Sequence, residues 1–279
     1  ISIFDSGIMY GDICFELTRS FKQKPYRLRD HLDRLYESLS YAEIDCGLSK
    51  NEMEKVSLEL VERSLPALGD FEFHLYHNIS RGGMGLYEEL INEGTDPIVA
   101  INIFPIVRTL GRMAKRYEEG AHFVTPRQQS VPWRCISPRA KTHSRVHYKL
   151  ADIEVGRMGD DLNALLTDDR GFLTEGTGNN FFMVRDGQIL TPKVHSILFG
   201  IGRKACLEVI ERVGMSVVET DLGPYDVLQA SEAWSTSTTI CMIPITRFNF
   251  KTVGDGKPGP VYKKLYDAWC EEVGLDIAA

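Results

Sequence analysis

The stretch Thr174-Glu175-Gly176-Thr177-Gly178-Asn179 is followed by Asn180 and the apolar run Phe181-Phe182-Met183-Val184. The apolar run predicts a buried strand, and the glycines before it predict a tight turn. Glu175 therefore stands at the end of a strand, 34 positions after Lys141. A lysine that can form a Schiff base and a carboxylate held where it can face a heterocyclic nitrogen are a chemically informative pair. Either residue alone would mean little, and their spacing is the central observation.

Two further motifs accompany this pair. Arg29-Asp30-His31-Leu32-Asp33-Arg34 lies upstream, and Leu198-Phe199-Gly200-Ile201-Gly202-Arg203 lies downstream. Taken together, the chain resembles the class IV (fold type IV) aminotransferases, which depend on pyridoxal 5'-phosphate (PLP). The family includes branched-chain and D-amino-acid aminotransferases, R-selective amine transaminases and aminodeoxychorismate lyases. The resemblance covers nearly the whole chain, and it implies two α/β (α+β) domains with the cofactor between them.

The bulk composition favours small-molecule chemistry. The 279 residues are 43% hydrophobic and 25% charged, which is typical of a globular protein with one large or two modest domains. No apolar run is long enough to span a bilayer, and a scattered net charge of −7 argues against nucleic acid as a partner. The six cysteines form no CxxC pair, so we expect reduced core thiols, a cytoplasmic location and no metal site.

Boundary signals predict a small N-terminal α+β domain over residues 1–107. Leu28, Leu32, Leu35 and Leu39 recur at helical spacing, and Ser49 with Glu52 forms a capping box that opens a second helix. Strands are expected at 1–4, 71–80 and 97–104. Because the first residue is Ile1, we also expect further residues to precede it.

A basic stretch at 108–115 is interpreted as an interdomain linker, which leaves 116–279 as a larger, sheet-rich cofactor-binding domain. Val146, Leu150 and Ile153 predict a helix that ends near Gly159. Hairpin turns are expected at 168–171 and 185–188, and a helix through Cys206 and Val213 should stop at Gly214.

The resemblance makes Lys141 the Schiff-base lysine, which would also move a proton between the substrate and the cofactor. Lys149 is the nearest competitor, but it lies only 26 positions before Glu175. Glu175 is expected to face the pyridine nitrogen and keep it protonated, with Asn180 fixing the carboxylate through a hydrogen bond. The alternative interpretations are an exposed lysine and a turn glutamate.

The cofactor phosphate is expected at the start of the helix after Gly200. The backbone N–H groups of Ile201 and Gly202 would bind it there, although the family usually has threonine at the position of Gly202. Thr238 would add a hydroxyl, and Arg34 would add a guanidinium fork. Without the resemblance, the Ser/Thr run 235–239 would be interpreted as a polar turn and Arg34 as a surface residue.

Substrate-binding residues are less well defined by the sequence. Tyr10 and Phe15 match pocket-lining positions, His31 and Arg81 match carboxylate-binding positions in some relatives, and the Thr239 backbone amide is a further candidate. Tyr10 and Phe15 can equally be core residues, and Arg81 can be a turn residue. Specialised relatives have substrate-binding residues at two other positions, but this chain has Leu86 and Val146 there. Neither specialised pocket is therefore reproduced.

These observations predict a PLP-dependent aminotransferase that transfers an amino group from an amino acid or amine to a 2-oxo acid by a ping-pong mechanism. A lyase of the aminodeoxychorismate type would share the cofactor residues, so it stays an alternative. A PLP-binding protein with little catalysis is a third hypothesis, which Lys141 disfavours. The resemblance also implies a homodimer.

Overall fold

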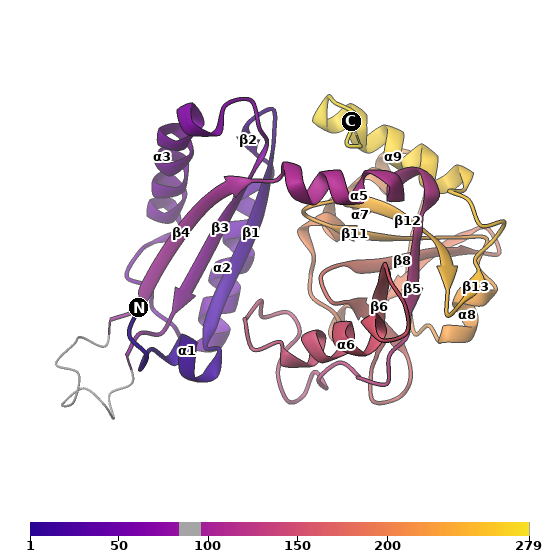
Figure 1. Ribbon diagram of the computed structural model, residues 1–279, viewed down its shortest axis with the longest axis horizontal. Coiled ribbons are helices and arrows are strands. Elements are labelled where there is room, and N and C mark those ends of the chain that lie inside the picture. The colour runs from indigo at the N-terminus through magenta and orange to yellow at the C-terminus, as the bar shows by residue number, and fades with distance from the viewer. Residues whose placement is uncertain (84–95, 279) are drawn as a thin grey trace. The chain divides into compact units, whose positions relative to one another are not determined.

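The computed structural model describes residues 1–83 and 96–278 (Figure 1). The chain forms two compact units. Unit 1 comprises Ile1–Arg108 and Arg139–Arg145, and unit 2 comprises Thr109–Pro138 and Val146–Ala279. Residues 139–145 thus leave their sequence neighbours and join unit 1.

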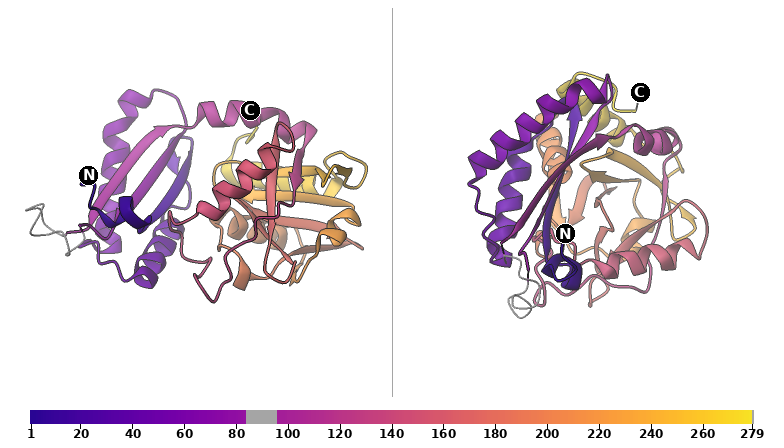
Figure 2. Two further views of the ribbon diagram at one scale, coloured as in Figure 1. Left: turned by 60° about the horizontal axis from the view of Figure 1, so that its bottom comes forward. Right: turned by 60° about the vertical axis from the view of Figure 1, so that its left-hand side comes forward.

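Unit 1 is built on an antiparallel sheet with the strand order β2-β1-β3-β4. Its strands are β1 (Ile13–Phe21), β2 (Lys24–Pro25), β3 (Phe73–Ser80) and β4 (Ile98–Pro105). Its helices are α1 (Ser6–Tyr10), α2 (Leu28–Ala42) and α3 (Lys50–Leu68). Figure 2 shows α2 and α3 packed on one face of this sheet.

The two long helices of unit 1 follow their sequence signals. α2 buries the predicted leucine stripe against the sheet, where it meets residues such as Leu75 and Phe73. The Ser49 side chain accepts from the Glu52 backbone N–H, and the Glu52 carboxylate accepts from the Ser49 N–H, so the predicted capping box is confirmed. The small apolar core lies between the helices and the sheet.

Residues 141–143 extend the unit 1 sheet at the free edge of β1. The Phe15 N–H donates to the Lys141 carbonyl at 3.0 Å, the His143 N–H donates to the Ile13 carbonyl at 2.9 Å, and Cys14 pairs with Thr142. Because side chains alternate along paired strands, Cys14 faces the helices while Phe15 faces the opposite side. The edge pairing therefore brings Lys141 and His143 to the Phe15 face.

Unit 2 contains a mixed nine-stranded sheet with the path β10-β9-β8-β11-β12-β5-β6-β7, and β13 pairs with β12. Its strands are β5 (Ala121–Val124), β6 (Leu162–Thr167), β7 (Leu173–Gly176), β8 (Asn180–Arg185), β9 (Gln188–Pro192), β10 (Val217–Thr220), β11 (Glu232–Ser237), β12 (Cys241–Phe248) and β13 (Lys251–Thr252). Its helical segments are α5 (Val107–Glu119, which begins at the boundary of unit 1), α6 (Val146–Gly156), η2 (Val194–Ser196), α7 (Ile201–Arg212), α8 (Pro224–Leu228) and α9 (Pro260–Val273).

The sheet of unit 2 is covered by helices on its apolar faces. α7 contacts β11 and α9, as Figure 1 shows, and Trp234 of β11 stacks on Phe182 of β8. Both predicted hairpins are present, β6–β7 and β8–β9, and α7 stops before Gly214, which has a φ of 75°. These elements place the ends of β7, β8 and β11 next to the start of α7.

The basic stretch 108–115, expected to be an interdomain linker, begins at the boundary between the two units and is helical, as part of α5. Three local expectations were wrong. Residues 1–4 form no strand, and the first regular element is α1, whose cap is the Asp5 side chain accepting from the Gly7 N–H at 2.7 Å. Cys135 is exposed, unlike the buried Cys14, Cys206 and Cys241.

The third difference is the orientation of α6. The helix is present, but Val146 is 71% exposed, Leu150 and Ile153 are also exposed, and Tyr148 and Ala151 are buried instead. Burial of one large aromatic side chain outweighs the stripe of smaller aliphatic residues. The face that the stripe indicated is therefore the outer one within unit 2.

Within residues 1–83 and 96–278, no helix is both long and apolar enough to cross a membrane.

Candidate active site

Lys141 lies at the sheet edge of unit 1, where its backbone is fixed on both sides. Its N–H donates to the Ser38 hydroxyl of α2 at 3.0 Å, and its carbonyl accepts from the Phe15 N–H. The Lys141 Nζ lies 4.4 Å from the centroid of the Phe15 ring. Lys149, the competing lysine, lies on the exposed side of α6. The structure therefore holds Lys141 as a pre-positioned, half-buried amine beside an aromatic ring.

Phe15 is the centre of a group of residues that sequence analysis only partly identified. The His143 ring lies 4.3 Å from the Phe15 ring, and Tyr76 contacts the same ring edge-on at 5.9 Å. The His143 Nε2 lies 2.9 Å from the Asn78 Oδ1 and 3.1 Å from the Tyr76 hydroxyl. Burial, followed by the charges of Arg145 and Lys141, lowers the pKa of His143, so its ring is neutral near pH 7. The alternation of residues 141, 143 and 145 was the available signal for this group.

The predicted residues Arg34 and His31 meet Glu16, which sequence analysis did not select. The Arg34 Nε donates to Glu16 Oε1 at 2.6 Å, its Nη2 donates to Glu16 Oε2 at 2.9 Å, and the His31 Nδ1 lies 2.7 Å from Glu16 Oε2. All three side chains are buried. Burial alone would raise the pKa of Glu16, but Arg34 and His31 outweigh it and the pKa is lowered. Burial also lowers the pKa of His31, so Glu16 and Arg34 form the ion pair and His31 stays neutral.

Arg81 bonds other residues, and the Tyr10 side chain is largely exposed. The Arg81 guanidinium donates to the Asp12 carboxylate at 2.7 Å and to the carbonyls of Ala42 and Glu43 at the end of α2 at 2.7 and 2.9 Å. These bonds favour the alternative interpretation of Arg81 as a structural turn residue. Tyr10 ends α1 with 63% of its surface exposed. Leu86 lies outside the described residues.

Glu175 is the best-organised carboxylate of unit 2. It sits on β7, is 4% exposed, and accepts hydrogen bonds from the Tyr148 hydroxyl at 2.6 Å, the Asn180 side-chain amide at 2.9 Å and the Leu198 N–H at 3.0 Å. The contact expected between Asn180 and Glu175 is therefore present. Tyr148 was missed because it lies on the buried face of α6, opposite the aliphatic stripe. Three donors favour the ionised carboxylate and fix its orientation.

The start of α7 lies against Asn180 and the turn that joins β11 to β12. A Cβ atom on Gly200 would come 2.0 Å from the Asn180 Oδ1, and one on Gly202 would come 2.7 Å from the carbonyl carbon of Ser237. Thr238 and Thr239 lie in this turn. The absence of side chains on the two glycines thus allows the N–H groups of Ile201 and Gly202 to approach a hydroxyl-rich turn. The threonine that the family usually has in place of Gly202 would not fit this arrangement.

The structure accordingly assembles the predicted residues into two groups. Unit 1 brings together Lys141 and Phe15, and the Lys141 charge also contributes to the lowered pKa of His31. Unit 2 brings together Glu175 and Asn180 with the start of α7 and the turn of Thr238 and Thr239.

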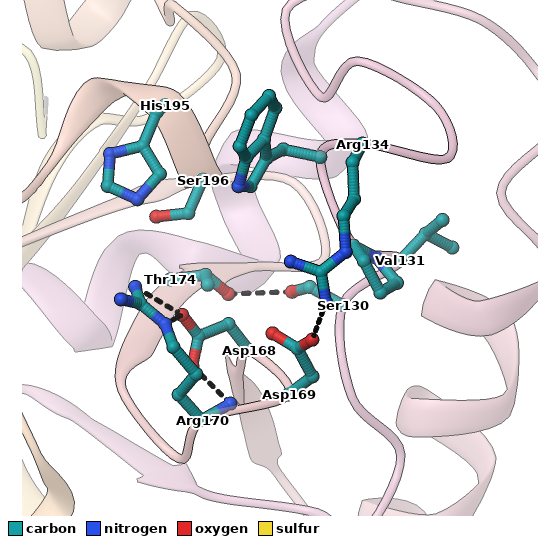
Figure 3. A pocket seen from close by; sticks show the side chains of 11 residues that line it. Ser130, Val131, Arg134, Asp168, Asp169, Arg170, Thr174, His195 and Ser196 are labelled. Carbon is teal, nitrogen blue, oxygen red and sulfur yellow. Dashed lines mark hydrogen bonds and ion pairs between the residues drawn. The ribbon is translucent and has the colours of Figure 1, made fainter.

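A pocket of about 390 Å³ lies behind β7 and is lined by Thr174, His195 and the loop around Trp133. Figure 3 shows that its charged groups pair with one another, Arg134 with Asp169 and Arg170 with Asp168, while Thr174 meets Ser130. Because successive strand residues face opposite sides, the Glu175 carboxylate points away from this pocket. None of the predicted site residues lines it.

Among the described residues, no cluster of three or more His, Cys, Asp or Glu side chains has an arrangement that could hold a metal ion.

The chain is similar to known aminotransferases along most of its length. The family model for class IV amino-transferases matches residues 13–248. A protein of Methanocaldococcus jannaschii, provisionally named a branched-chain-amino-acid aminotransferase, is 33% identical over 266 residues, which cover 95% of this chain and 88% of that one. The D-alanine aminotransferase of Bacillus licheniformis is 29% identical over 270 residues, which cover 96% of this chain and 90% of that one.

Solved structures show the same fold. A T.th. branched-chain amino acid aminotransferase, complexed with N-(5'-phosphopyridoxyl)-L-glutamate, superposes with a TM-score of 0.85 at 25% identity. The match covers 98% of this chain and 88% of that one. The two-unit α/β architecture predicted from the sequence is therefore confirmed.

Proposed function

Because the chain belongs to the class IV aminotransferases, we propose that it uses PLP to transfer an amino group from an amino acid or amine to a 2-oxo acid in a ping-pong cycle. The observation that carries the proposal is the buried Glu175 carboxylate, held by three donors: Tyr148 of α6, Asn180 at the start of β8 and the Leu198 N–H before α7. A rigid anion of this kind is what a protonated pyridine nitrogen requires.

The residues present fit PLP at both ends. The start of α7 offers backbone N–H groups and a positive helix end, and Gly202 packs on Ser237, the residue before Thr238, whose hydroxyl is a further candidate donor. These groups suit a phosphate dianion. Arg34 is a further candidate for the phosphate, held in place by Glu16.

Bound PLP supplies an electron sink for the charge that develops when the substrate loses its α-proton. Lys141 would hold the cofactor covalently through Nζ and then, once the amino donor has displaced it, move that proton as a general base and acid. Its fixed backbone and the Phe15 ring limit the positions that Nζ can take. Glu175 would keep the ring nitrogen protonated, and Asn180 and Tyr148 would keep Glu175 oriented.

Borohydride reduction tests this proposal directly. Reduction of the PLP-loaded protein converts the lysine–cofactor bond into a stable secondary amine, and peptide mapping then locates it. We expect the phosphopyridoxyl label on Lys141, and Lys141→Ala should lose both the label and turnover by several orders of magnitude. A label on Lys149, or no label with saturating PLP, would contradict the assignment.

A donor screen with L-amino acids, D-amino acids and chiral amines distinguishes the transferase from the lyase alternative. An aminotransferase converts the bound cofactor to its amino form with one equivalent of donor and needs a 2-oxo acid to return. Release of pyruvate from an aryl substrate without an acceptor would instead establish a lyase.

We also propose a homodimer, on the strength of the family resemblance, and a cytoplasmic location, on the strength of the cysteine pattern. Light scattering on the PLP-loaded protein should give twice the chain mass, and a monomer would contradict the proposal.

A further inference from the structure

The Phe15 face of unit 1 collects three basic residues from one short segment. Lys141 and His143 lie on one side of the edge strand, Arg145 follows in the turn after it, and all three contact the Phe15 ring: the Lys141 Nζ at 4.4 Å, the His143 ring at 4.3 Å and the Arg145 Cζ at 5.5 Å. The last distance is within the usual range for a cation over an aromatic face. The distance between the Lys141 Nζ and the Arg145 Cζ is therefore no greater than the sum of their distances to the centroid of this ring.

The strands of unit 1 bring no acidic side chain to this face. Glu16 is the only acidic residue in β1, β3 and β4, and it lies among the buried side chains on the helix side, bonded to Arg34. His143 adds no charge, because burial lowers its pKa and its ring is neutral. A ligand beside Lys141 thus meets the field of the Arg145 guanidinium, which suits a carboxylate.

The backbone next to Arg145 is also fixed in place. The Ser144 hydroxyl donates to the carbonyls of Tyr10 and Gly11 at 3.1 and 3.0 Å, and the Arg145 N–H donates to the His143 carbonyl at 2.6 Å. The contact with the Phe15 ring limits the positions of the Arg145 guanidinium, so it loses less side-chain entropy than a fully exposed arginine when it binds an anion. Arg81, the arginine that the sequence indicated for this task, instead bonds Asp12 and the end of α2.

We propose that Arg145 binds a carboxylate of the substrate, and that the preferred substrates are amino acids and 2-oxo acids, not neutral amines. The inference rests on the proposed function, because it takes Lys141 as the reacting amine. Lys141 and Arg145, on the same ring, then define the amino end and the acid end of one ligand.

The test measures binding of unreactive probes to the PLP-loaded protein by titration of the cofactor absorbance. The probes are 4-methylvalerate and succinate, and the control probe is 4-methylvaleramide, which has nearly the shape of the monocarboxylate but no charge. The variants are Arg145→Gln and Arg145→Lys. Arg63→Gln is the matched control, since it removes the same charge from unit 1 at a side chain that is 77% exposed on α3.

Arg145→Gln should raise the Kd of at least one carboxylate roughly 30-fold or more, the scale expected when a charge pair loses one partner. In the same variant the Kd of the amide should change by less than about threefold. The carboxylate Kd of Arg145→Lys should lie between those of Arg145→Gln and the unchanged protein, and the Kd values of Arg63→Gln should equal those of the unchanged protein. Loss for succinate alone would place Arg145 at the distal acid group, and loss for both acids would place it at the shared one.

Carboxylate Kd values that stay within about threefold in Arg145→Gln would overturn the proposal, as would an equal loss for acid and amide. Borohydride labelling is run on the same samples. A label on Lys141 with unchanged carboxylate binding means that only the role of Arg145 fails, whereas no label on Lys141 in the unchanged protein means that the proposed function fails. If Arg145→Gln does not load PLP, the test uses Arg145→Lys. A carboxylate Kd in Arg145→Lys equal to that of the unchanged protein would then overturn the role proposed for the Arg145 guanidinium.

Discussion

The hydrogen bond from the Tyr148 hydroxyl to Glu175 can be removed without changing the shape of either side chain. Tyr148→Phe leaves Asn180 and the Leu198 N–H on the carboxylate, so Glu175 should keep its charge but lose one positional restraint. We expect kcat to fall by roughly tenfold, about 1.4 kcal/mol, because a hydrogen bond to a charged group contributes on this order. Steady-state kinetics with separate PLP titrations measure the effect, and KM for the amino donor should hardly change.

The control introduces Tyr148→Phe into a protein that already carries Glu175→Gln. In the Glu175→Gln variant the ring nitrogen would lose the anionic partner that we propose for it, so turnover should fall further than in Tyr148→Phe. If Tyr148 acts through Glu175, adding Tyr148→Phe to Glu175→Gln should cause little additional loss. Independent, additive losses would show that Tyr148 contributes through packing of α6 instead.

For individual side chains, the sequence predicted contacts between residues close in the chain better than contacts between residues of different helices and strands. The bond from Asn180 to Glu175 was foreseen because both residues flank one tight turn. Tyr148 was not, since aliphatic periodicity in α6 indicated the opposite face. Arg81 matched a position in relatives, but only the fold reveals its bonds to Asp12 and the end of α2.

The packing of α7 on the β11–β12 turn depends on a glycine. A methyl group at position 202 would lie 2.7 Å from the Ser237 carbonyl carbon and 2.8 Å from its oxygen, both of them backbone atoms that cannot rotate away. Gly202→Ala should therefore destabilise unit 2 by about 1–3 kcal/mol, the usual range for overpacking. It should also weaken PLP binding, because the helix start must move. Urea unfolding followed by tryptophan fluorescence is suitable, since Trp133, Trp234 and Trp269 all lie in unit 2.

Gly178→Ala is the matched control. Gly178 belongs to the turn after Glu175, yet a Cβ there would meet no atom within 4 Å. The same chemical change should leave the unfolding midpoint and PLP affinity nearly unaltered. Equal destabilisation of both variants would rule out the close approach of α7 as the cause.

Elements with local boundary chemistry were predictable, whereas those set by long-range pairing were not. The capping box of α3 and the hairpins β6–β7 and β8–β9 each rest on a few adjacent residues. The edge strand at 141–143 pairs with residues 13–15, and its sequence shows no strand run of its own. The basic stretch expected to be a linker begins at the unit boundary, but its helical conformation as part of α5 was not predicted, because charged side chains are compatible with both a loop and an exposed helix.

For the whole molecule, unit 1 should be the acid-sensitive part. Burial lowers the pKa of His77 to about 4 and, together with the Arg19 charge, lowers that of His74 to about 4, against 6.5 in the unfolded chain. The unfolded chain therefore binds more protons between these values, and stability falls as the pH drops from about 6.5 to 4. The slope should reach about 1.4 kcal/mol per pH unit for each histidine. Amide hydrogen exchange in β1 and β3 measures it.

The variant His77→Gln checks the assignment. The His77 Nε2 lies 2.7 Å from the Ser57 hydroxyl, which donates to the Met53 carbonyl, and a glutamine amide can donate in the same way. This variant lacks one titrating group, so its stability should depend less steeply on pH by about one proton. A slope unchanged from that of the parent protein would show that other groups cause the acid sensitivity.

The edge strand of unit 1 has a consequence for how the protein is made. During translation, residues 1–108 leave the ribosome well before residues 139–145, so the free edge of β1 stays open until the later segment arrives. Thirty residues of unit 2 are synthesised in between. An open strand edge can pair with another nascent chain. Lys141, the lysine that we propose reacts, thus belongs to the segment that pairs with the free edge of β1, so a chain stalled before residue 141 lacks this lysine and exposes an unpaired strand edge.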